Sequence, residues 1–417
     1  MTQQTVAFVG LGYIGLPTAV IMANSGLNVV GIDVKTENVK RINQGEITIV
    51  EPGLEEALKS ALQSGNFRAT TDMVHANAYI VAVPTPFTAE YSIDMKYIYS
   101  VAESIAPLLE GGELVVLEST SPPMTTHKMA ERILELRPDL IADGEENPDE
   151  KPVVYFAHCP ERILPGNALE ELVSNDRIIG GETDEATRRA TEIYRSFCQG
   201  ELLPTKAVTA EMAKLTENSF RDVNIAFANE LSVICGKLGI NVWELINLAN
   251  HHPRVNILQP GPGVGGHCIA VDPWFIISAD PENSRLLRTA REVNDAKPEW
   301  VANQVEEAVK RAQATSIAAL GLSFKANIDD LRESPALEIT EEIAKKFPNL
   351  EILTVEPNVE NLPQSLQGFS NVTLCSEREA IEQAGVIILL VDHDEFKNVP
   401  AASLKGKEVI DTKGLWQ

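Results

Sequence analysis

One cysteine stands in an unusual setting, within the run GPGVGGHCIAVDP at residues 261–273. A cysteine at an arbitrary position is more often an inert, small apolar residue than a nucleophile. Glycines at 261, 263, 265 and 266, however, remove side chains from around Cys268 and let backbone amides approach its sulfur. This setting predicts a thiolate that adds to a carbonyl carbon, with Asp272 as a hydrogen-bond partner of the base or of water. His267 could also act there, or could simply pack or contact a substrate.

Three polar residues on a predicted long helix form a second candidate group. Lys214, Asn218 and Arg221 are spaced by four and then three residues, which puts them on one face of a helix. A solvated polar stripe is the ordinary explanation of such a face. Apolar neighbours favour instead a helix buried on more than one side, with its polar face lining a cleft. These neighbours are Met212, Leu215, Phe220, Val223 and Phe227.

The N-terminus has the pattern of a dinucleotide site. A short apolar run at 6–9 leads into Gly10, Gly12 and Gly15, a helical stretch follows, and Asp33 ends the next apolar run. The first glycine permits a tight turn, the second a close approach of a pyrophosphate, and the third close packing of helix on strand. A carboxylate at Asp33 binds ribose hydroxyls and disfavours a 2′-phosphate, so the pattern predicts NAD rather than NADP. A glycine turn without a ligand is the alternative.

Further apolar runs alternate with amphipathic helical segments, as in a doubly wound parallel sheet. The runs in the first half are AYIVAVPTP, LVVLEST, VVYFAHCPER and RIIGG. Thr85 and Thr120 lie just beyond strand ends, where parallel sheets bind ligands, although turn chemistry alone also explains them. A long helix is expected from about 209 to 238 and another over 284–313, after which the strand and helix rhythm restarts.

We therefore expect an α/β fold of two Rossmann-like doubly wound domains joined by a helical central domain that contains one long helix. The expected boundaries are 1–205 for an N-terminal NAD-binding Rossmann domain, 206–300 for a central helical domain, and 301–417 for a C-terminal Rossmann-like domain.

The composition narrows the class of partner. The chain has 35 basic and 60 acidic side chains, which give a formal net charge of −25. Such a surface repels phosphate backbones and anionic lipid, so neither nucleic acid nor a membrane is an expected partner. The first apolar run is broken by glycine, proline and asparagine, and predicts neither a signal peptide nor a membrane span. Five scattered cysteines without C-x-x-C favour a cytoplasmic protein with no metal site.

Six motifs occur in the order seen in the UDP-glucose/GDP-mannose dehydrogenase family, and through them the chain resembles that family over essentially its whole length. They are Gly10-x-Gly12-x-x-Gly15, ESTSPP, CPERILPG, KLTENSFRDVNIAFANEL, GPGVGGHCIAVDP and SFKANIDDLRESP. The resemblance implies NAD as cofactor and a four-electron oxidation of a nucleotide sugar at C6. The oxidation would pass through a thiohemiacetal and a thioester on the cysteine.

The resemblance also implies roles for individual residues. Cys268 is the nucleophile, Lys214 gives and takes the proton of the reacting hydroxyl, and Asn218 holds the oxyanion with Lys214. Asp272 assists proton transfer, and Glu161 orients the substrate or the hydrolytic water. Contacts with NAD are expected at Gly10, Gly12, Tyr13, Ile14, Gly15, Asp33, Thr85, Thr120, Thr126 and Arg332. Contacts with the nucleotide sugar are expected at Arg162, Ile163, Lys214, Asn218, Arg221, His252, Arg254, Gly265, Phe324, Lys325 and Lys413.

Two departures from the UDP-glucose members bear on the substrate. Val271 stands where those members have a lysine, and Pro165 where they have a second acidic residue. With the stretches HPRVNILQPGPGVGGHC and CPERILPG, these departures favour a UDP-N-acetylhexosamine. We expect UDP-N-acetyl-D-mannosamine, with UDP-N-acetyl-D-glucosamine as the alternative epimer. In such enzymes the equivalent of Arg254 reaches into the neighbouring subunit's site, which implies a homodimer built on the long helix.

Other functional classes remain open on the sequence. A two-electron hydroxyacid dehydrogenase shares the N-terminal fold and a helix lysine, but needs neither Cys268 nor a second α/β unit. It predicts one NADH per substrate. A non-catalytic nucleotide-sugar sensor would bind both ligands without forming NADH, and a scaffold would bind neither.

Overall fold

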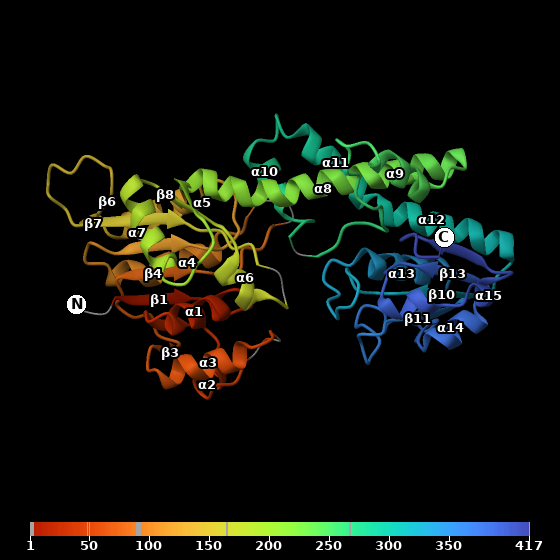
Figure 1. Ribbon diagram of the computed structural model, residues 1–417, viewed down its shortest axis with the longest axis horizontal. Coiled ribbons are helices and arrows are strands. Elements are labelled where there is room, and N and C mark those ends of the chain that lie inside the picture. Colours follow the sequence, from red (N-terminus) through yellow and green to blue (C-terminus); the bar gives the residue numbers. More distant parts are fainter. Residues whose placement is uncertain are drawn as a thin grey trace. The chain divides into compact units, whose positions relative to one another are not determined.

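The computed structural model describes residues 4–47, 49, 51–88, 93–163, 166–266 and 268–416. The chain divides into two compact units. The first consists of Met1–Glu217 with Trp274–Ala279, and the second of Asn218–Pro273 with Asp280–Gln417. Figure 1 shows the helices and strands of each unit and labels those for which there is room. Each unit contains its own β-sheet, as the restarted strand and helix rhythm of the sequence predicts.

The sheet of the first unit has the strand order β3-β2-β1-β4-β5-β7-β8-β9, with β6 paired to β7. The strands are β1 Thr5–Val9, β2 Asn28–Ile32, β3 Phe67–Thr70, β4 Ala78–Val81, β5 Leu114–Leu117, β6 Ile141–Ala142, β7 Val153–His158, β8 Arg177–Gly181 and β9 Leu202–Lys206. The order 3-2-1-4-5 is that of a dinucleotide-binding sheet. One neighbour departs from the expected parallel pairing, because β8 runs antiparallel to β7. The described residues of the link between these strands form one short helix, α6, Ala168–Ser174, and β8 enters the sheet from the edge at which β7 ends.

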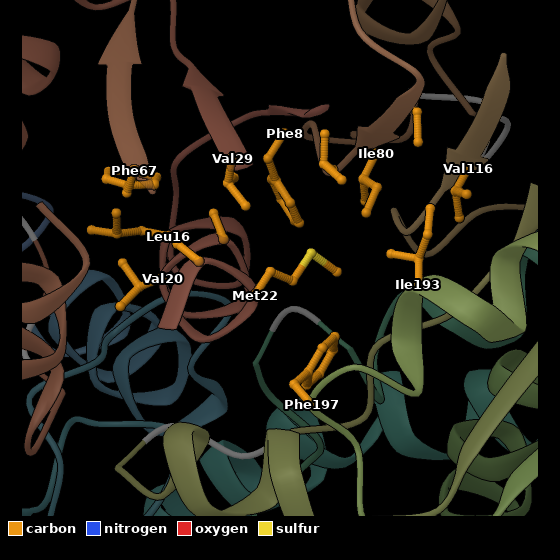
Figure 2. Packing of buried hydrophobic residues seen from close by; sticks show 14 of the residues in the cluster. Phe8, Leu16, Val20, Met22, Val29, Phe67, Ile80, Val116, Ile193 and Phe197 are labelled. Atoms are coloured by element: carbon orange, nitrogen blue, oxygen red, sulfur yellow. The ribbon is translucent and has the colours of Figure 1, made fainter. Parts of the chain in front are cut away.

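Both faces of this sheet are covered. Side chains alternate along a strand, so β1 contributes Val6 and Phe8 to one buried cluster and Ala7 and Val9 to another. Figure 2 shows Phe8 of the first cluster together with Leu16 and Met22 of α1. Burial on both faces explains why the strands read as continuous apolar runs. The other helices are α1 Gly15–Asn24, α2 Thr36–Asn43, α3 Leu54–Gln63, α4 Lys96–Ile105, α5 Thr125–Leu136, α7 Asp184–Tyr194 and a 3₁₀ helix at Ala106–Leu108.

The second unit contains a parallel sheet in the order β12-β11-β10-β13-β14. Its strands are β10 Ser316–Leu320, β11 Glu351–Val355, β12 Val372–Leu374, β13 Val386–Leu389 and β14 Glu408–Asp411. Its helices are α9 Val242–Asn250, α11 Arg285–Asp295, α12 Lys297–Ala312, α13 Pro335–Lys346, α14 Glu377–Gln383, α15 Ala401–Leu404 and a 3₁₀ helix at Asp394–Asn398. Helices α8, Ala207–Leu238, and α10, Asp272–Ala279, contain residues of both units.

The prediction of one helix over 284–313 is wrong, because the segment forms α11 and α12 with a break at Ala296. Pro298 lies in the first turn of α12, where its missing N–H costs nothing, but a proline inside a continuous helix would break the hydrogen-bond ladder. Helix α13 starts directly after Ser334. The Ser334 side chain caps α13 by accepting a hydrogen bond from the N–H of Leu337.

The long helix α8 is present as predicted, but its apolar side chains are not uniformly buried. Leu215 is fully buried, whereas Met212, Phe220 and Phe227 are 37%, 70% and 52% exposed. The expectation that these three residues indicate burial within the chain is therefore wrong. Among the helices that the structure describes, none is both long and apolar enough to cross a bilayer.

Candidate functional site

The three glycines of the turn after β1 have different surroundings, which show at which positions the fold itself requires glycine. Gly10 has φ +98°, and a Cβ there would lie 2.2 Å from the carbonyl oxygen of Ala82. A Cβ at Gly15 would lie 1.8 Å from the carbonyl oxygen of Gly10. A Cβ at Gly12 would meet no atom within 4 Å. The fold therefore requires glycine at 10 and 15, while the open space at Gly12 fits a phosphate that approaches the backbone.

Asp33 lies at the end of β2, facing this turn. Its Oδ2 accepts from the N–H of Leu11 at 3.2 Å, and its Oδ1 from the N–H of Lys35 at 2.8 Å. The carboxylate is thereby fixed beside the glycine turn, and it stays partly exposed. A carboxylate in this position can accept the hydroxyls of an adenosine ribose. The residues present thus fit NAD.

Three threonines predicted to contact NAD have different surroundings. Thr85 donates to the carbonyl oxygen of Thr120 at 2.7 Å, which joins the loops that follow the parallel neighbours β4 and β5. Thr126 is fully buried, and both its hydroxyl and its N–H donate to Oε1 of Glu211 at 2.7 Å. The structure therefore brings Thr85 and Thr120 together at the carboxyl edge of the sheet, while the Thr126 hydroxyl ties α5 to α8.

Tyr13 and Ile14 follow the second glycine. The Tyr13 hydroxyl donates to Oε2 of Glu51 at 2.7 Å, and burial together with Glu51 raises the pKa of Tyr13 to about 12. Tyr13 therefore keeps its proton at neutral pH. Ile14 packs against a small apolar cluster that contains Ile163, so a predicted NAD contact and a predicted sugar contact are neighbours. Sequence reasoning missed Glu51, which also accepts from the N–H of Ala168 at 2.6 Å.

Glu161 has both carboxylate oxygens occupied. Oε1 accepts from the N–H of Arg162 at 2.7 Å, and Oε2 accepts from Nη2 of Arg177 at 2.7 Å. Arg177 is the first residue of β8 and is only 4% exposed. The Arg162 side chain points elsewhere and pairs with Glu217 at 2.8 Å. Sequence reasoning missed Arg177, although a cation that opens the apolar run RIIGG was a signal for a buried ion pair.

A second carboxyl group, Glu118 of the ESTSPP motif, approaches the same guanidinium. Its Oε1 lies 3.7 Å from Nη1 of Arg177 and accepts from the Tyr194 hydroxyl at 2.7 Å. Its Oε2 has no hydrogen-bond partner within the part of the chain that the structure describes. Burial raises the pKa of Glu118 to about 7, which Arg177 opposes and Glu161 reinforces. The interior of the first unit thus holds a carboxyl that titrates near neutral pH.

In the second unit Cys268 is exposed and lies in a turn four residues before the first residue of α10. Its carbonyl oxygen accepts from the N–H of Asp272 at 2.9 Å. Asp272 is buried, and its Oδ2 accepts from Nδ2 of Asn218 at 2.6 Å. Three residues predicted to act together are therefore brought together here. Lys214 lies one helical turn before Asn218 on α8 and is partly exposed.

Arg332 lies beside the Cys268 loop. Its carbonyl oxygen accepts from the N–H of Gly266 at 3.3 Å. The hydrogen bond to Asp330 raises the pKa of Arg332, and the sulfur of Cys268 contributes to the same shift. A guanidinium near a thiol favours the thiolate, which is the reactive form. The Arg332 side chain therefore lies near enough to the Cys268 side chain for the two to interact electrostatically.

The structure corrects the interpretation of the glycines before Cys268. A Cβ at Gly263 would lie 2.8 Å from Cβ of Pro335, one at Gly265 2.4 Å from the carbonyl oxygen of Glu333, and one at Gly266 2.9 Å from the Phe324 ring. These glycines allow the loop to pack on residues 324–335, so they do not clear space for a substrate. The loop begins at Gly261, whose N–H donates to Oδ1 of the buried Asn229 at 2.9 Å.

The remaining predicted sugar contacts are mostly exposed. Lys325, Arg221, His252 and Arg254 are exposed, and Nδ1 of His252 accepts from the N–H of Arg254 at 3.3 Å. Lys413 pairs with Asp392 at 3.1 Å, and its ammonium lies 4.0 Å from the place of a Cβ at Gly261. The structure therefore puts Lys413 beside the cysteine loop. His267 and Pro165 lie outside the described residues.

Three family models match successive parts of the chain. They describe the NAD binding domain, the central domain and the UDP binding domain of the UDP-glucose/GDP-mannose dehydrogenase family, and match residues 4–198, 208–296 and 318–417. The UDP-N-acetyl-D-mannosamine dehydrogenase of Escherichia coli (strain K12) is 54% identical, and the alignment covers 100% of both chains. The NDP-N-acetyl-D-galactosaminuronic acid dehydrogenase of Ralstonia nicotianae is 52% identical over 99% of this chain and 96% of that protein.

Solved structures give the same result. A UDP-D-ManNAc dehydrogenase from Pyrococcus horikoshii has a TM-score of 0.86 and 39% sequence identity. The match covers 99% of this chain and 96% of that one. Fold and sequence therefore agree over the full length of the chain.

The contrast between Gly12 and Gly15 is testable. We expect Gly12→Ala to leave the melting temperature of the NAD-free protein unchanged, because a Cβ there meets no protein atom. It should weaken NAD binding at least about tenfold, or about 1.4 kcal/mol. Gly15→Ala should lower the melting temperature itself. Thermal unfolding with and without NAD measures both effects, and Gly368→Ala, which also meets open space, is the control. Unchanged NAD affinity in Gly12→Ala would contradict this assignment.

Glu118 predicts a pH dependence of stability. The pKa of Glu118 is raised from 4.5 to about 7 in the folded state. The folded state therefore favours the protonated carboxyl, and this contribution to the free energy of unfolding is complete only below pH 4.5. The free energy of unfolding of the wild-type protein should therefore fall by about 3 kcal/mol relative to that of Glu118→Gln as the pH rises from about 4.5 to above 7. Chemical denaturation of both proteins at pH 5 and pH 8.5 measures this difference. A difference that does not change with pH would show that Glu118 ionises normally.

Proposed function

Because the chain belongs to the UDP-glucose/GDP-mannose dehydrogenase family, we propose that it oxidises C6 of UDP-N-acetyl-D-mannosamine to a carboxylate, giving UDP-N-acetyl-D-mannosaminuronate. The family, the fold and the NAD cofactor that the sequence predicted are confirmed by the matches. The observation that carries the proposal is the exposed Cys268, four residues before the buried Asp272, whose carboxylate accepts a hydrogen bond from Asn218. The name of the 54% identical Escherichia coli relative supports the choice of sugar.

The reaction needs a base, a nucleophile and a hydrolytic step. NAD, when bound at the glycine turn, supplies the hydride acceptor. In our proposal Lys214 takes the proton of the C6 hydroxyl and Asn218 supports the oxyanion. The Cys268 thiolate then adds to the aldehyde carbon, and oxidation of that adduct gives a thioester. Water cleaves the thioester, with Glu161 orienting the water and Asp272 assisting proton transfer, and the thiolate is regenerated.

The domain roles and the compartment belong to the same proposal. We assign residues 1–205 to NAD binding, 206–300 to catalysis and dimer formation, and 301–417 to the UDP moiety. Arg254, Lys325 and Arg332 supply the positive charge that an acidic protein needs to hold a diphosphate. No disulfide joins the described cysteines, which suits the cytoplasm as the place of action.

The two rival classes are weaker. A two-electron hydroxyacid dehydrogenase does not account for the match of the UDP binding domain at 318–417 or for a second complete sheet. A sensor without chemistry does not require Lys214, Asn218, Cys268 and Asp272 together. Sequence similarity alone does not distinguish the sugar epimers. The relative named for a galactosaminuronic acid is 52% identical to this chain, and the mannosamine relative is 54% identical.

We propose that the protein is a homodimer joined through α8. Within the second unit Phe220, Phe227, Ile234 and Leu238 are 70%, 52%, 45% and 64% exposed. At 100° per residue they lie within an arc of about 40° on one face of the helix. Asn218 lies about 160° around the helix from Phe220, so an interface on this stripe leaves the face of Asn218 to the site. Burial of each large side chain would contribute about 1.5–3 kcal/mol.

Stoichiometry tests the proposed reaction. We expect two NADH per UDP-N-acetyl-D-mannosamine consumed, because oxidation of an alcohol to an acid removes two hydrides. UDP-N-acetyl-D-glucosamine, UDP-N-acetyl-D-galactosamine and UDP-glucose should react at least about tenfold more slowly, as expected when a pocket is built for one arrangement of hydroxyls. Absorbance at the NADH band and mass spectrometry of the sugar measure both. Full turnover by Cys268→Ser would contradict the mechanism, and one NADH per sugar would favour the two-electron rival.

Mixed dimers test whether Arg254 acts in the partner's site. Cys268→Ser and Arg254→Ala proteins should each be nearly inactive alone. In a dimer of the two, one site has both Cys268 and the partner's intact Arg254, so an exchanged mixture should recover roughly a quarter of wild-type activity. Mixing followed by an NADH assay measures the recovery. If Arg254 serves its own subunit's site, the mixture stays inactive, and a monomer in sedimentation would contradict the dimer itself.

A further inference from the structure

The first unit contains a buried ionic cluster of which the proposed mechanism uses only Glu161. Arg177 is its centre, with Nη2 at 2.7 Å from Glu161, Nη1 at 3.7 Å from Glu118 and Nη1 at 3.8 Å from Sγ of Cys159. The three charged side chains are 5%, 8% and 0% exposed for Arg177, Glu161 and Glu118. Two carboxyl groups therefore share one guanidinium away from water.

Aromatic rings hold this guanidinium in place. Its central carbon lies 5.1 Å from the centre of the Tyr194 ring and 5.4 Å from that of the Phe197 ring. The hydroxyl of Tyr194 also donates to Glu118 at 2.7 Å. A cation stacked on rings and paired with carboxylates has little freedom to turn. The position of Arg177 is thus set by the core and not by a ligand.

Glu161 takes its orientation from this arginine. Its second oxygen is held by the N–H of Arg162 at 2.7 Å, so the carboxylate has two fixed donors and one preferred direction. A group that orients water in a hydrolytic step must be held to within a fraction of an ångström. Loss of the guanidinium would leave the Glu161 carboxylate buried with one donor fewer and without a counter-ion.

Charge balance separates the two carboxyl groups. One guanidinium neutralises one carboxylate, and a second buried negative charge is costly. Glu161 is the closer of the two, so Glu118 is the group that keeps a proton. Oε1 of Glu118 faces the Tyr194 hydroxyl and Arg177, so the proton lies on Oε2. The Cys159 thiol stays protonated at neutral pH, because burial raises its pKa to about 12.

We propose that Arg177 is a positioning residue that fixes the Glu161 carboxylate for hydrolysis of the Cys268 thioester, and that Glu118 competes for the same guanidinium when it ionises. This rests on the proposed function, since it assigns Arg177 to the last step of that reaction. The facing groups come from three parts of the chain. These are Glu118 after β5, Cys159 and Glu161 after β7, and Tyr194 of α7, all arranged around Arg177 of β8.

The competition predicts a pH dependence of turnover. As Glu118 loses its proton near neutral pH, its carboxylate attracts Arg177, and Glu161 is held less firmly. Hydrolysis of the thioester should then slow on the alkaline side. In Glu118→Gln the Tyr194 hydrogen bond is retained, but no second negative charge can form. That variant should keep its kcat at alkaline pH where the wild-type value falls.

The experiment is rapid mixing of NAD and UDP-N-acetyl-D-mannosamine with wild type, Arg177→Lys and Glu161→Gln. Both hydrides leave before hydrolysis, so the two variants should release a burst of two NADH per site and then turn over at least about tenfold more slowly. KM should stay within about threefold of wild type. Intact-protein mass spectrometry should detect the acyl adduct on Cys268. The double variant should be no slower than Glu161→Gln, because the two residues act as one unit.

Arg189→Lys is the matched control. Arg189 also pairs with a glutamate, Glu185 at 2.9 Å, and stacks on the Tyr155 ring at 3.6 Å, but it has no contact with Glu161 in the described structure. It should lose some thermal stability without a burst or an adduct. The proposal is overturned if Arg177→Lys slows the burst and the steady state equally, or if it turns over at the wild-type rate.

Three further outcomes distinguish the roles of Arg177 and Glu118 from the proposed function. If Arg177→Lys does not fold, the pH profile of Glu118→Gln decides, and a profile identical to wild type overturns the role of Glu118. If wild-type protein reduces no NAD with any of the UDP-sugars, the proposed function itself fails. If wild type releases two NADH per sugar and Glu161→Gln accumulates the adduct but Arg177→Lys does not, only the assignment of Arg177 fails.

Discussion

Buried carboxylates that accept hydrogen bonds from backbone N–H groups fix several of the loops around the candidate sites. Glu51 accepts from Gly166 and Ala168, Glu211 from Met124 and Thr126, and Glu356 from Leu322 and Ser323. A buried charge must be compensated, and in a chain with 60 acidic and 35 basic residues the backbone is the abundant donor. Acidic side chains therefore fix the conformations of these loops. Glu161 and Glu118 differ from these carboxylates, because the two also share one buried cation, Arg177.

In both units a carboxylate that follows one strand accepts a hydrogen bond from the backbone of the turn after the neighbouring strand, but only one of the two carboxylates can contact a ligand. In the first, Asp33 at the end of β2 accepts from Leu11 in the turn after β1. In the second, Glu356 just after β11 accepts from Leu322 in the turn after β10. Burial alone would raise the pKa of Glu356, but the bond to His393 at 3.1 Å and the backbone donors lower it to about 2. Because Glu356 is only 4% exposed, it cannot meet a ribose as Asp33 can. The second unit keeps the architecture without that contact.

The features that the sequence predicts correctly are those whose cause is local. Continuous apolar runs specify strands buried on both faces, and the spacing of Gly10, Gly12 and Gly15 specifies the turn. The residues that sequence reasoning missed make contacts across long separations, as Glu211 does with Thr126 and Glu51 with Ala168, 85 and 117 positions apart. The glycines before Cys268 were noticed but misinterpreted, because their neighbours at 324–335 cannot be read from the loop itself.

Helix α8 explains how one element can serve both a site and an interface. An α-helix presents residues two positions apart on nearly opposite sides, so Asn218 and Phe220 need not compete for the same surroundings. Asn218 is tied to Asp272, and Phe220 is left 70% exposed, which is costly for a side chain of that size unless a partner covers it. A dimer interface on the apolar face of α8 that contains Phe220 would hold in place the helix that carries Asn218. Loosening of that interface would therefore weaken the support that Asn218 gives to the oxyanion. In the proposed dimer, subunit association and chemistry would therefore be coupled through the rigidity of a single helix.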